Sequence, residues 1–301
     1  MKSRLPASSL VLVVVAVSLS AAQEKTVLPG VRTPDYPAAS LLQEAAELRN
    51  IPSPTIFDVR TKDQYAKGHI PGAVWIDASA WEKAFRGEPD VESWSARLGE
   101  IGIEPQRPVV VYGDDDVRTP ARLWWILRCW GVKDVRLLNG GWSAWKEAGG
   151  QVSEGNTKAQ PSLLRLTAEG NRLATKDQLL AALKAKPPQI IDARSNAEYC
   201  GTAGIAKRNG SIPGAIHLEW TECLDKKTKK FKSKEELAQL LKERQIDVNQ
   251  PAVTYCQSGG RAAVVAFTLE LMGGKQVKNY YRSWAEWGNA EDTPVAKPKK
   301  N

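Results

Sequence analysis

One cysteine stands in a setting that suits chemistry: Cys256, in the run Tyr255-Cys256-Gln257-Ser258-Gly259-Gly260-Arg261. The preceding residues, Pro251 to Tyr255, have the pattern of a short buried strand. The following residues, Ala262 to Met272, are apolar helix formers that stop at Gly273-Gly274, which is typical of a helix C-terminus. The pattern therefore predicts that Cys256 lies in a loop between a strand and a helix.

This loop has two properties that favour a thiolate over a thiol. Gly259 and Gly260 let the backbone curl so that successive N–H groups converge, and the N-terminus of the next helix adds partial positive charge. The alternative is a buried, inert cysteine, but such a residue needs neither the glycines nor the helix. We therefore predict that Cys256 is a reactive thiol in an anion-binding loop.

The other cysteines lack such a context. Cys129 lies in an apolar segment, where a cysteine is usually a small core residue. Cys200 and Cys223 could pair in an oxidising compartment, although sequence alone does not establish the geometry. With only His69 and His217 in the chain, a zinc site or a cysteine–histidine catalytic pair has little to be built from.

An internal repeat with an offset near 142 residues organises the chain. Four segments recur in the same order: Ile56–Arg60 as Ile190–Arg194, His69–Ala73 as Ser211–Ala215, Val110–Tyr112 as Val253–Tyr255, and Trp142–Trp145 as Trp284–Trp287. Short apolar strands alternate with helical stretches such as Pro120 to Trp130 and Lys234 to Arg244, which predicts βα units and a parallel sheet in each copy. The fold class is therefore α/β, in two tandem domains.

We expect domain boundaries at residues 30–150 and 171–290, joined by a linker over 151–170 and followed by a flexible basic tail over 291–301. In the first copy, Gly113 aligns with Cys256, and Asp114-Asp115-Asp116 follows it. That copy lacks the thiol and presents three negative charges to an incoming anion. We expect it to be inactive and to cover one side of the working site, supporting the second domain; a separate binding function is the alternative.

The N-terminus has the pattern of a signal peptide. Lys2 and Arg4 precede an apolar stretch from Leu10 to Leu19, and small residues end at Ala22. We expect cleavage near Ala22, with export to the periplasm or outside the cell. An uncleaved membrane anchor is the alternative, but the apolar stretch is too short to span a bilayer, so no stable membrane insertion is expected.

The net charge of +8 is only moderately basic. Its clearest cluster, between Lys226 and Lys234, has no aromatic platform apart from Phe231, so we expect a solvated surface segment and no nucleic-acid binding. The chain has 11 tryptophans, and five of them are concentrated in the first copy: Trp124, Trp125, Trp130, Trp142 and Trp145. We expect these to be core and domain-interface residues rather than a ligand platform.

These motifs together resemble the rhodanese family of sulfurtransferases, specifically its tandem-domain members with a silent first domain and an active second one. Four features carry the resemblance: the strand end Asp192 to Arg194, the stretch Arg208 to Ala215, the loop opening at Cys256, and Ser283-Trp284. The resemblance implies two rhodanese-like domains, each a small parallel five-stranded sheet flanked by helices. It implies no metal or organic cofactor.

The resemblance also implies a reaction and its participants. The thiolate of Cys256 would take the outer sulfur of an anionic donor such as thiosulfate, and cyanide or a thiol would remove it from the persulfide. The residues expected to bind the donor are Arg194, Arg261, Gln257, Ser258, Gly259 and Gly260. Asp192 is expected to order the loop or to pair with an arginine. A protein sulfur partner is possible.

We infer the sulfur donor from positions at which this chain differs from members of the family. Members that use mercaptopyruvate typically carry a second arginine where this chain has Cys200, and a Cys-Gly-Ser-Gly-Val-Thr loop. Vertebrate thiosulfate enzymes place arginine and lysine directly after the cysteine, where this chain has Gln257 and Ser258. Thiosulfate is the favoured donor, and mercaptopyruvate is the alternative.

Two rival functions remain. Related phosphatases place five residues between cysteine and arginine, whereas four separate Cys256 from Arg261, which gives a loop suited to a single sulfur atom. An exported persulfide carrier that receives sulfur from a partner protein would use the same loop, but it would stall after one sulfur.

Overall fold

The computed structural model describes residues 35–87, 90–166 and 172–299. The expected signal peptide, residues 1–22, lies outside the described residues. Both copies of the repeat belong to one compact unit of the structure. Among the described residues, no helix is both long enough and apolar enough to cross a membrane.

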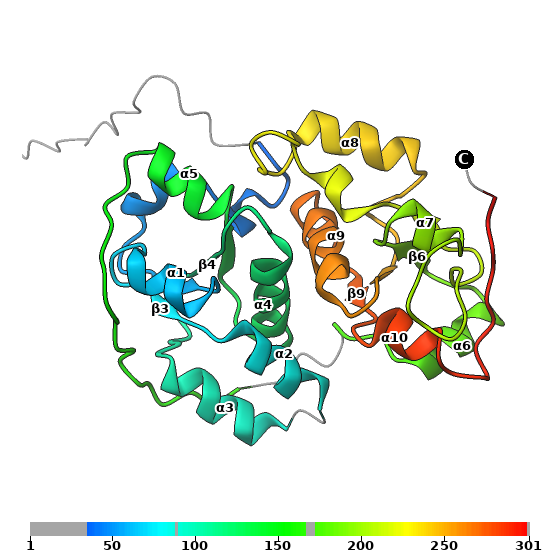
Figure 1. Cartoon of the computed structure of the whole chain (residues 1–301), viewed down its shortest axis with the longest axis horizontal. Helices are drawn as coiled ribbons and strands as arrows, with labels where there is room; N and C mark the ends of the chain where they lie inside the picture. Colours follow the sequence, from blue (N-terminus) through cyan, green and yellow to red (C-terminus); the bar gives the residue numbers. More distant parts are fainter. Residues whose placement is uncertain (1–34, 88–89, 167–171, 300–301) are drawn as a thin grey trace, which may run out of the picture. The chain divides into compact units, whose positions relative to one another are not determined.

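The first copy begins with short 3-10 turns and continues as alternating strands and helices (Figure 1). Its elements in chain order are η1 (Ala39–Leu41), β1 (Leu42–Gln43), η2 (Ala45–Asn50), β2 (Thr55–Asp58), α1 (Lys62–Lys67), β3 (Val74–Trp75), α2 (Ala78–Arg86), α3 (Val91–Glu100), β4 (Val109–Tyr112), α4 (Arg118–Cys129), β5 (Val135–Leu138) and α5 (Gly141–Glu147).

The second copy repeats this order. Its elements are α6 (Lys176–Leu183), β6 (Gln189–Asp192), α7 (Asn196–Tyr199), β7 (Ile216–His217), η3 (Trp220–Cys223), α8 (Lys234–Glu243), β8 (Ala252–Tyr255), α9 (Gly260–Leu271), β9 (Val277–Asn279) and α10 (Ser283–Trp287). The predicted helices at Pro120 to Trp130 and Lys234 to Arg244 correspond to α4 and α8.

Both sheets are parallel, with strand orders β1-β5-β4-β2-β3 and β7-β6-β8-β9. The registers match between the copies, since Asp58 pairs with Tyr112 and Asp192 pairs with Tyr255. The same local signals start equivalent helices: Thr61 and Gln64 form a capping box on α1, and Ser195 and Glu198 form one on α7. The α/β class and the tandem arrangement are therefore confirmed.

The second sheet differs from the expected five strands. It contains four strands among the described residues, and Leu173 makes an isolated parallel bridge to Asn279. This bridge lies where β1 pairs with β5 in the first sheet. One residue pair is too little to form a strand, so the outermost strand of the second sheet is reduced to a single contact.

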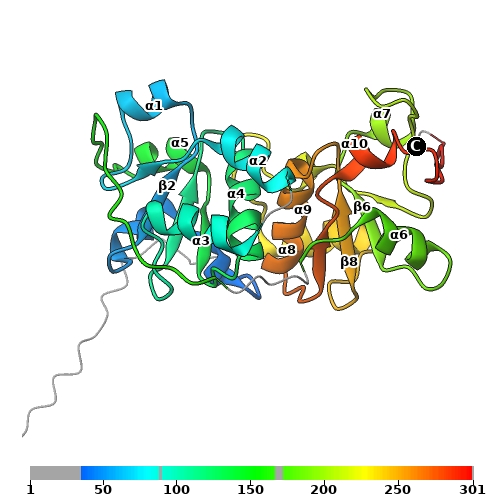
Figure 2. The same ribbon diagram turned by 90° about the horizontal axis from the view of Figure 1, so that it is seen from below.

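The largest apolar core runs through both copies. Its centre is α9, in which every residue except Arg261 is buried, as expected for a helix that is apolar all round. Helices α4 and α9 lie side by side in Figures 1 and 2. Between them, Trp124 meets Phe267 edge to face at 4.9 Å between ring centroids. Trp124, Trp125 and Trp130 belong to this shared core, and Trp145 to a smaller core of the first copy.

The structure bears on two expectations about the surface. In the lysine-rich segment, Lys226, Lys227 and Lys229 are exposed, but Phe231 is buried and its N–H donates to Asn139 of the first copy. The expected flexible tail is packed instead over its described part, because Ala296 exchanges backbone hydrogen bonds with Ser211 and Arg208 donates to the carbonyl of Thr293. In both segments, satisfied backbone groups and apolar contacts fix residues that composition alone marks as solvated.

Candidate functional site

The Cys256 loop connects β8 to α9. The helix begins at Gly260, two residues before the predicted start, and Gly259 precedes it with a φ of 88°. This left-handed turn points backbone amides back at the sulfur: the N–H of Gly259 lies 3.1 Å from Sγ of Cys256, and the N–H of Ser258 lies 3.4 Å from it. Two amide donors at the N-terminus of a 12-residue helix make a setting that stabilises a sulfur anion.

Neighbouring groups hold the loop in place from behind. The N–H of Cys256 donates to Oγ of Ser283, and the Trp284 N–H donates to the carbonyl of Cys256. The side-chain amide of Asn279 donates to the carbonyl of Gly259. The loop therefore keeps its curl without help from a ligand.

Cys256 is only 1% exposed, which is less than we expected of a reactive thiol. It nevertheless lines a cavity of about 310 Å³. The cavity walls come from both copies: Ala78, Ser79, Glu82, Asp116, Arg118, Thr119 and Arg122 from the first, and Gln257, Ser258, Gly260 and Arg261 from the second. The sulfur is thus recessed at the bottom of a cavity because the first copy covers it.

Three arginines line this cavity, and each has a carboxylate partner. Arg118 pairs with Asp116 at 2.6 Å, Arg122 pairs with Glu82, and Arg261 pairs with Glu198 at 2.6 Å. Glu82 is shared, because it also pairs with Arg86 at 2.6 Å. Four guanidinium groups therefore face three carboxylates, which leaves the region around Cys256 with an excess of positive charge.

The pKa directions agree with this arrangement. Burial opposes the charge of Arg261, but its hydrogen bonds to Glu198 and its attraction to the Cys256 sulfur raise its pKa. The hydrogen bonds that Arg118 donates to Asp116 raise the pKa of Arg118, and the Cys256 charge contributes in the same direction. Both guanidinium groups therefore stay charged and favour an anion at the sulfur.

Arg194 lies apart from the cavity in which we expect the donor to bind, and Asp192 pairs with an arginine, which is one of the two roles expected of it. Arg194 is buried and forms a fork with Asp192, with Nη2 at 2.6 Å from Oδ2, and it also donates to the carbonyl of Gly210. Its guanidinium lies 4.3 Å from the Trp284 ring. Arg194 is not among the described residues that line the cavity of Cys256. These contacts connect the end of β6 to Gly210 and Trp284, so Arg194 has a structural role.

The remaining expected site residues are distributed around the thiol. Gln257 and Ser258 line the cavity with Gly260, while Gly259 contributes its N–H and lies under the ring of Tyr281. The side-chain carbonyl of Gln257 is buried and accepts no hydrogen bond within the described part of the chain. The oxygen of this amide therefore has an unused hydrogen-bonding capacity beside the cavity.

Sequence reasoning did not identify the residues that the first copy contributes. Arg118 and Arg122 lie on α4, and Glu82 lies on α2. We expect Asp114, Asp115 and Asp116 to repel an incoming anion from the first copy. Asp116, however, lines the cavity of Cys256. Arg118 and Arg122 follow Gly113 to Asp116, which is the first-copy counterpart of the Cys256 loop. This position in the sequence could have identified them as site residues.

The other cysteines are poor candidates for chemistry. No disulfide joins Cys200 and Cys223. Burial raises the pKa of Cys223 to about 12, so its thiol is inert at neutral pH. Cys200 is buried, and its sulfur lies 3.4 Å from Oδ1 of Asn196. Within the described residues, no three histidine, cysteine or acidic side chains form a group that could hold a metal ion.

Comparisons with known proteins agree with this geometry. The family model for the rhodanese-like domain matches residues 41–148 and 175–290. The thiosulfate sulfurtransferase of Azotobacter vinelandii is 32% identical over 268 residues, which cover 87% of this chain and 98% of the relative. The 3-mercaptopyruvate sulfurtransferase of Escherichia coli is 30% identical over 250 residues, covering 81% of this chain and 88% of the relative.

A solved structure shares the fold at lower identity. An anaerobic ergothioneine biosynthesis enzyme from Chlorobium limicola superposes with a TM-score of 0.76 and 24% identity, covering 85% of this chain and 70% of that one. Both copies therefore have the rhodanese-like fold, and the relatives at 30–32% identity are named sulfurtransferases. This chain belongs to the rhodanese family, with two rhodanese-like domains.

Proposed function

We propose that this protein is a thiosulfate sulfurtransferase that works through a persulfide on Cys256. One observation carries the proposal: Sγ of Cys256 accepts hydrogen bonds from two backbone N–H groups and lines a cavity that three arginines also line. Relatives named thiosulfate sulfurtransferase, 29–32% identical to this chain, support the same activity.

The reaction follows from the site. The Cys256 thiolate attacks the outer sulfur of thiosulfate, the sulfur–sulfur bond of the donor breaks with its electron pair, and sulfite leaves. Arg118 and Arg122 attract the dianionic donor, and the amides of Ser258 and Gly259 stabilise the persulfide anion. Cyanide or a thiolate then attacks the outer sulfur and restores the Cys256 thiolate.

The test is mass spectrometry of the protein after treatment with thiosulfate, together with a thiocyanate assay in cyanide. We expect an adduct of one sulfur atom on Cys256, repeated turnover, and loss of both in Cys256→Ser with the fold intact by circular dichroism. Retained activity in that variant would remove Cys256 from the mechanism. A single turnover would favour a carrier, and release of phosphate from an aryl phosphate would favour a phosphatase.

The second candidate donor is 3-mercaptopyruvate, which the Escherichia coli relative supports by its name. Against it stands Cys200, which occupies the position of the second arginine and is buried against Asn196. Comparing kcat/KM for the two donors decides between them. We expect thiosulfate to give the higher value.

We also propose that the protein is exported, because Lys2 and Arg4 precede a short apolar stretch that ends in small residues near Ala22. N-terminal sequencing of the protein recovered from the periplasm or medium tests this proposal. A mature chain that starts after Ala22 is expected, and an intact N-terminus would contradict cleavage.

A further inference from the structure

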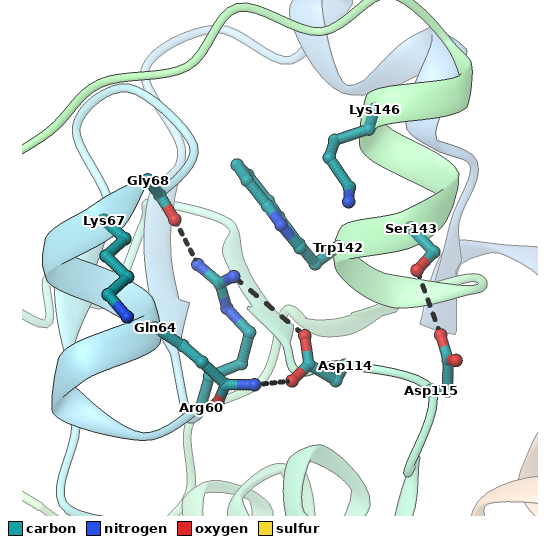
Figure 3. A pocket seen from close by; sticks show the side chains of 9 residues that line it. All are labelled: Arg60, Gln64, Lys67, Gly68, Asp114, Asp115, Trp142, Ser143 and Lys146. Atoms are coloured by element: carbon teal, nitrogen blue, oxygen red, sulfur yellow. Dashed lines mark hydrogen bonds and ion pairs between the residues drawn. The ribbon is translucent and has the colours of Figure 1, made fainter.

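The first copy has a cavity of its own, of about 420 Å³, between α1, α5 and the loop that follows β4 (Figure 3). Its walls include Arg60, Gln64 and Lys67 on one side, and Trp142, Ser143 and Lys146 on the other. This volume lies in the range of sites that hold small molecules. The cavity does not include Cys256 and has no role in the mechanism above.

The floor of this cavity is a scaffold that both copies share. Arg60 forms a fork with Asp58 at 2.6 Å, as Arg194 does with Asp192, and its guanidinium lies 4.3 Å from Trp142, as that of Arg194 lies from Trp284. The hydroxyl of Tyr112 donates to Asp58, and that of Tyr255 donates to Asp192, both at 2.6 Å. Because these contacts occur in both copies, we attribute them to the fold and not to a ligand site of the first copy.

The charged rim of the cavity is specific to the first copy. Counted from the shared capping boxes and tryptophans, Lys67 and Lys146 correspond to Gly201 and Gly288. Counted from Gly113 and Cys256, Asp114 and Asp115 correspond to Gln257 and Ser258. Four charges thus stand where the second copy has none, so the fold does not require them.

The positive and the negative rim charges lie on different parts of the cavity wall. Figure 3 shows Lys67 on α1 and Lys146 on α5, on two sides of the cavity, with Asp114 and Asp115 at the loop below. Neither lysine has an ion-pair partner within the described ranges, whereas Arg60 pairs with Asp58 at 2.6 Å and with Asp114 at 4.0 Å. Asp114 accepts a hydrogen bond from Gln64, and Asp115 accepts one from Ser143. Lys67, Lys146 and Asp115 are therefore rim charges that no oppositely charged side chain pairs with in the described part of the chain.

We propose that this cavity binds a zwitterionic α-amino acid. The lysines would hold the carboxylate, Asp115 would hold the ammonium group, and Trp142 would supply an apolar wall for the side chain. A dianion such as thiosulfate would face the repulsion of the unpaired Asp115, and a simple cation would face the two unpaired lysines. Only a ligand with both charges satisfies both sides of the rim.

The proposal is tested by isothermal titration calorimetry of the mature protein with glycine, L-methionine and L-tyrosine. We expect at least one of them to bind with a Kd on the order of 1 mM or tighter. Its N-acetyl form, which lacks the ammonium charge, and its amide, which lacks the carboxylate, should each bind about tenfold more weakly. No binding by any of the three amino acids, or equal binding by the blocked forms, would overturn the proposal.

Variants locate the site. Lys146→Gln and Asp115→Asn should each weaken binding about three- to tenfold, as expected for the loss of a partly exposed charge partner. Lys242→Gln, on the exposed side of α8, is the matched control and should bind as the parent does. Cys256→Ser should also bind normally while it loses sulfur transfer, so failure of this site and failure of the proposed function are separable. Unchanged binding in both rim variants would exclude this cavity.

Discussion

At the residue scale, we expect the positive charge around Cys256 to contribute most to donor binding. Arg122 is the least exposed of the first copy's two arginines in the cavity, and its Nη2 lies 3.5 Å from Oγ of Ser258. Because it attracts the donor without touching the sulfur that is transferred, its contribution should appear in binding rather than in the chemical step.

We expect Arg122→Gln to raise KM for thiosulfate about tenfold with kcat little changed, because one charge-assisted contact to the donor is lost. Steady-state kinetics with cyanide as the acceptor measure both constants. Arg107→Gln is the control, since Arg107 pairs with Glu104 on the surface away from the cavity. An unchanged KM in Arg122→Gln would place the donor elsewhere.

Glu198 provides a prediction about pH. Burial alone would raise its pKa, but the hydrogen bonds and charge of Arg261 outweigh burial and lower the pKa from 4.5 to about 2. A lowered pKa in the folded state means that the ionised form stabilises the fold above pH 4.5, and that this stability is lost as the pH falls toward 2.

Glu198→Gln should therefore lower the melting temperature at neutral pH, while glutamine still caps α7 as Gln64 caps α1. The difference in melting temperature between parent and variant should shrink as the pH falls from 4.5 toward 2. Thermal melts at a series of pH values measure it. A difference that stays constant with pH would show that the Arg261 ion pair does not stabilise the fold.

At the element scale, the turn from β8 into α9 depends on one glycine. Gly259 has a φ of 88°, and a Cβ atom at this position would lie 2.6 Å from the Tyr281 ring. Alanine there meets both backbone strain and a clash. A shift of this turn would also move the N–H that faces Cys256.

We expect Gly259→Ala to lower the free energy of unfolding by about 2–5 kcal/mol and to impair sulfur transfer in the folded fraction. Gly155→Ala is the matched control, because Gly155 has a φ of 84° with open space around it and carries the strain without the clash. Urea denaturation and the thiocyanate assay measure the two effects. Equal losses in the two variants would show that contact with Tyr281 does not matter.

Local patterns predicted the elements better than their assembly. The strand before Cys256 and the apolar helix after it are encoded within about twenty residues, so β8 and α9 were predictable. The internal repeat and the alternation of apolar strands with helical stretches predicted the tandem α/β order. The cavity was not predictable in full, because Glu82, Arg118 and Arg122 approach Cys256 only through packing between distant segments. The pairing of Arg261 with Glu198 is likewise a long-range contact.

At the scale of the whole molecule, the two copies share one apolar core. Phe267 on α9 contacts Trp124 of the first copy and lies 4.8 Å from Phe231 between ring centroids. Removal of its ring would leave a cavity at the contact between the copies. The two copies should therefore unfold together and not as separate domains.

We expect Phe267→Ala to lower the free energy of unfolding by about 3–5 kcal/mol, and calorimetry of the parent protein to show a single transition. Leu163→Ala is the control, because Leu163 is fully exposed and should have little effect. Two separate transitions in the parent protein would show that the copies unfold independently.

The contact between α4 and α9 bears on the evolutionary origin of the tandem chain. The two helices follow equivalent strands of the two copies, so each copy offers the same surface to the other. Self-complementary contacts of this kind are how two identical subunits associate around a twofold axis. Fusion of such a pair into one polypeptide secures the partner permanently. One half can then lack the thiol, as the first copy does at Gly113, while it still shields the thiol of its twin.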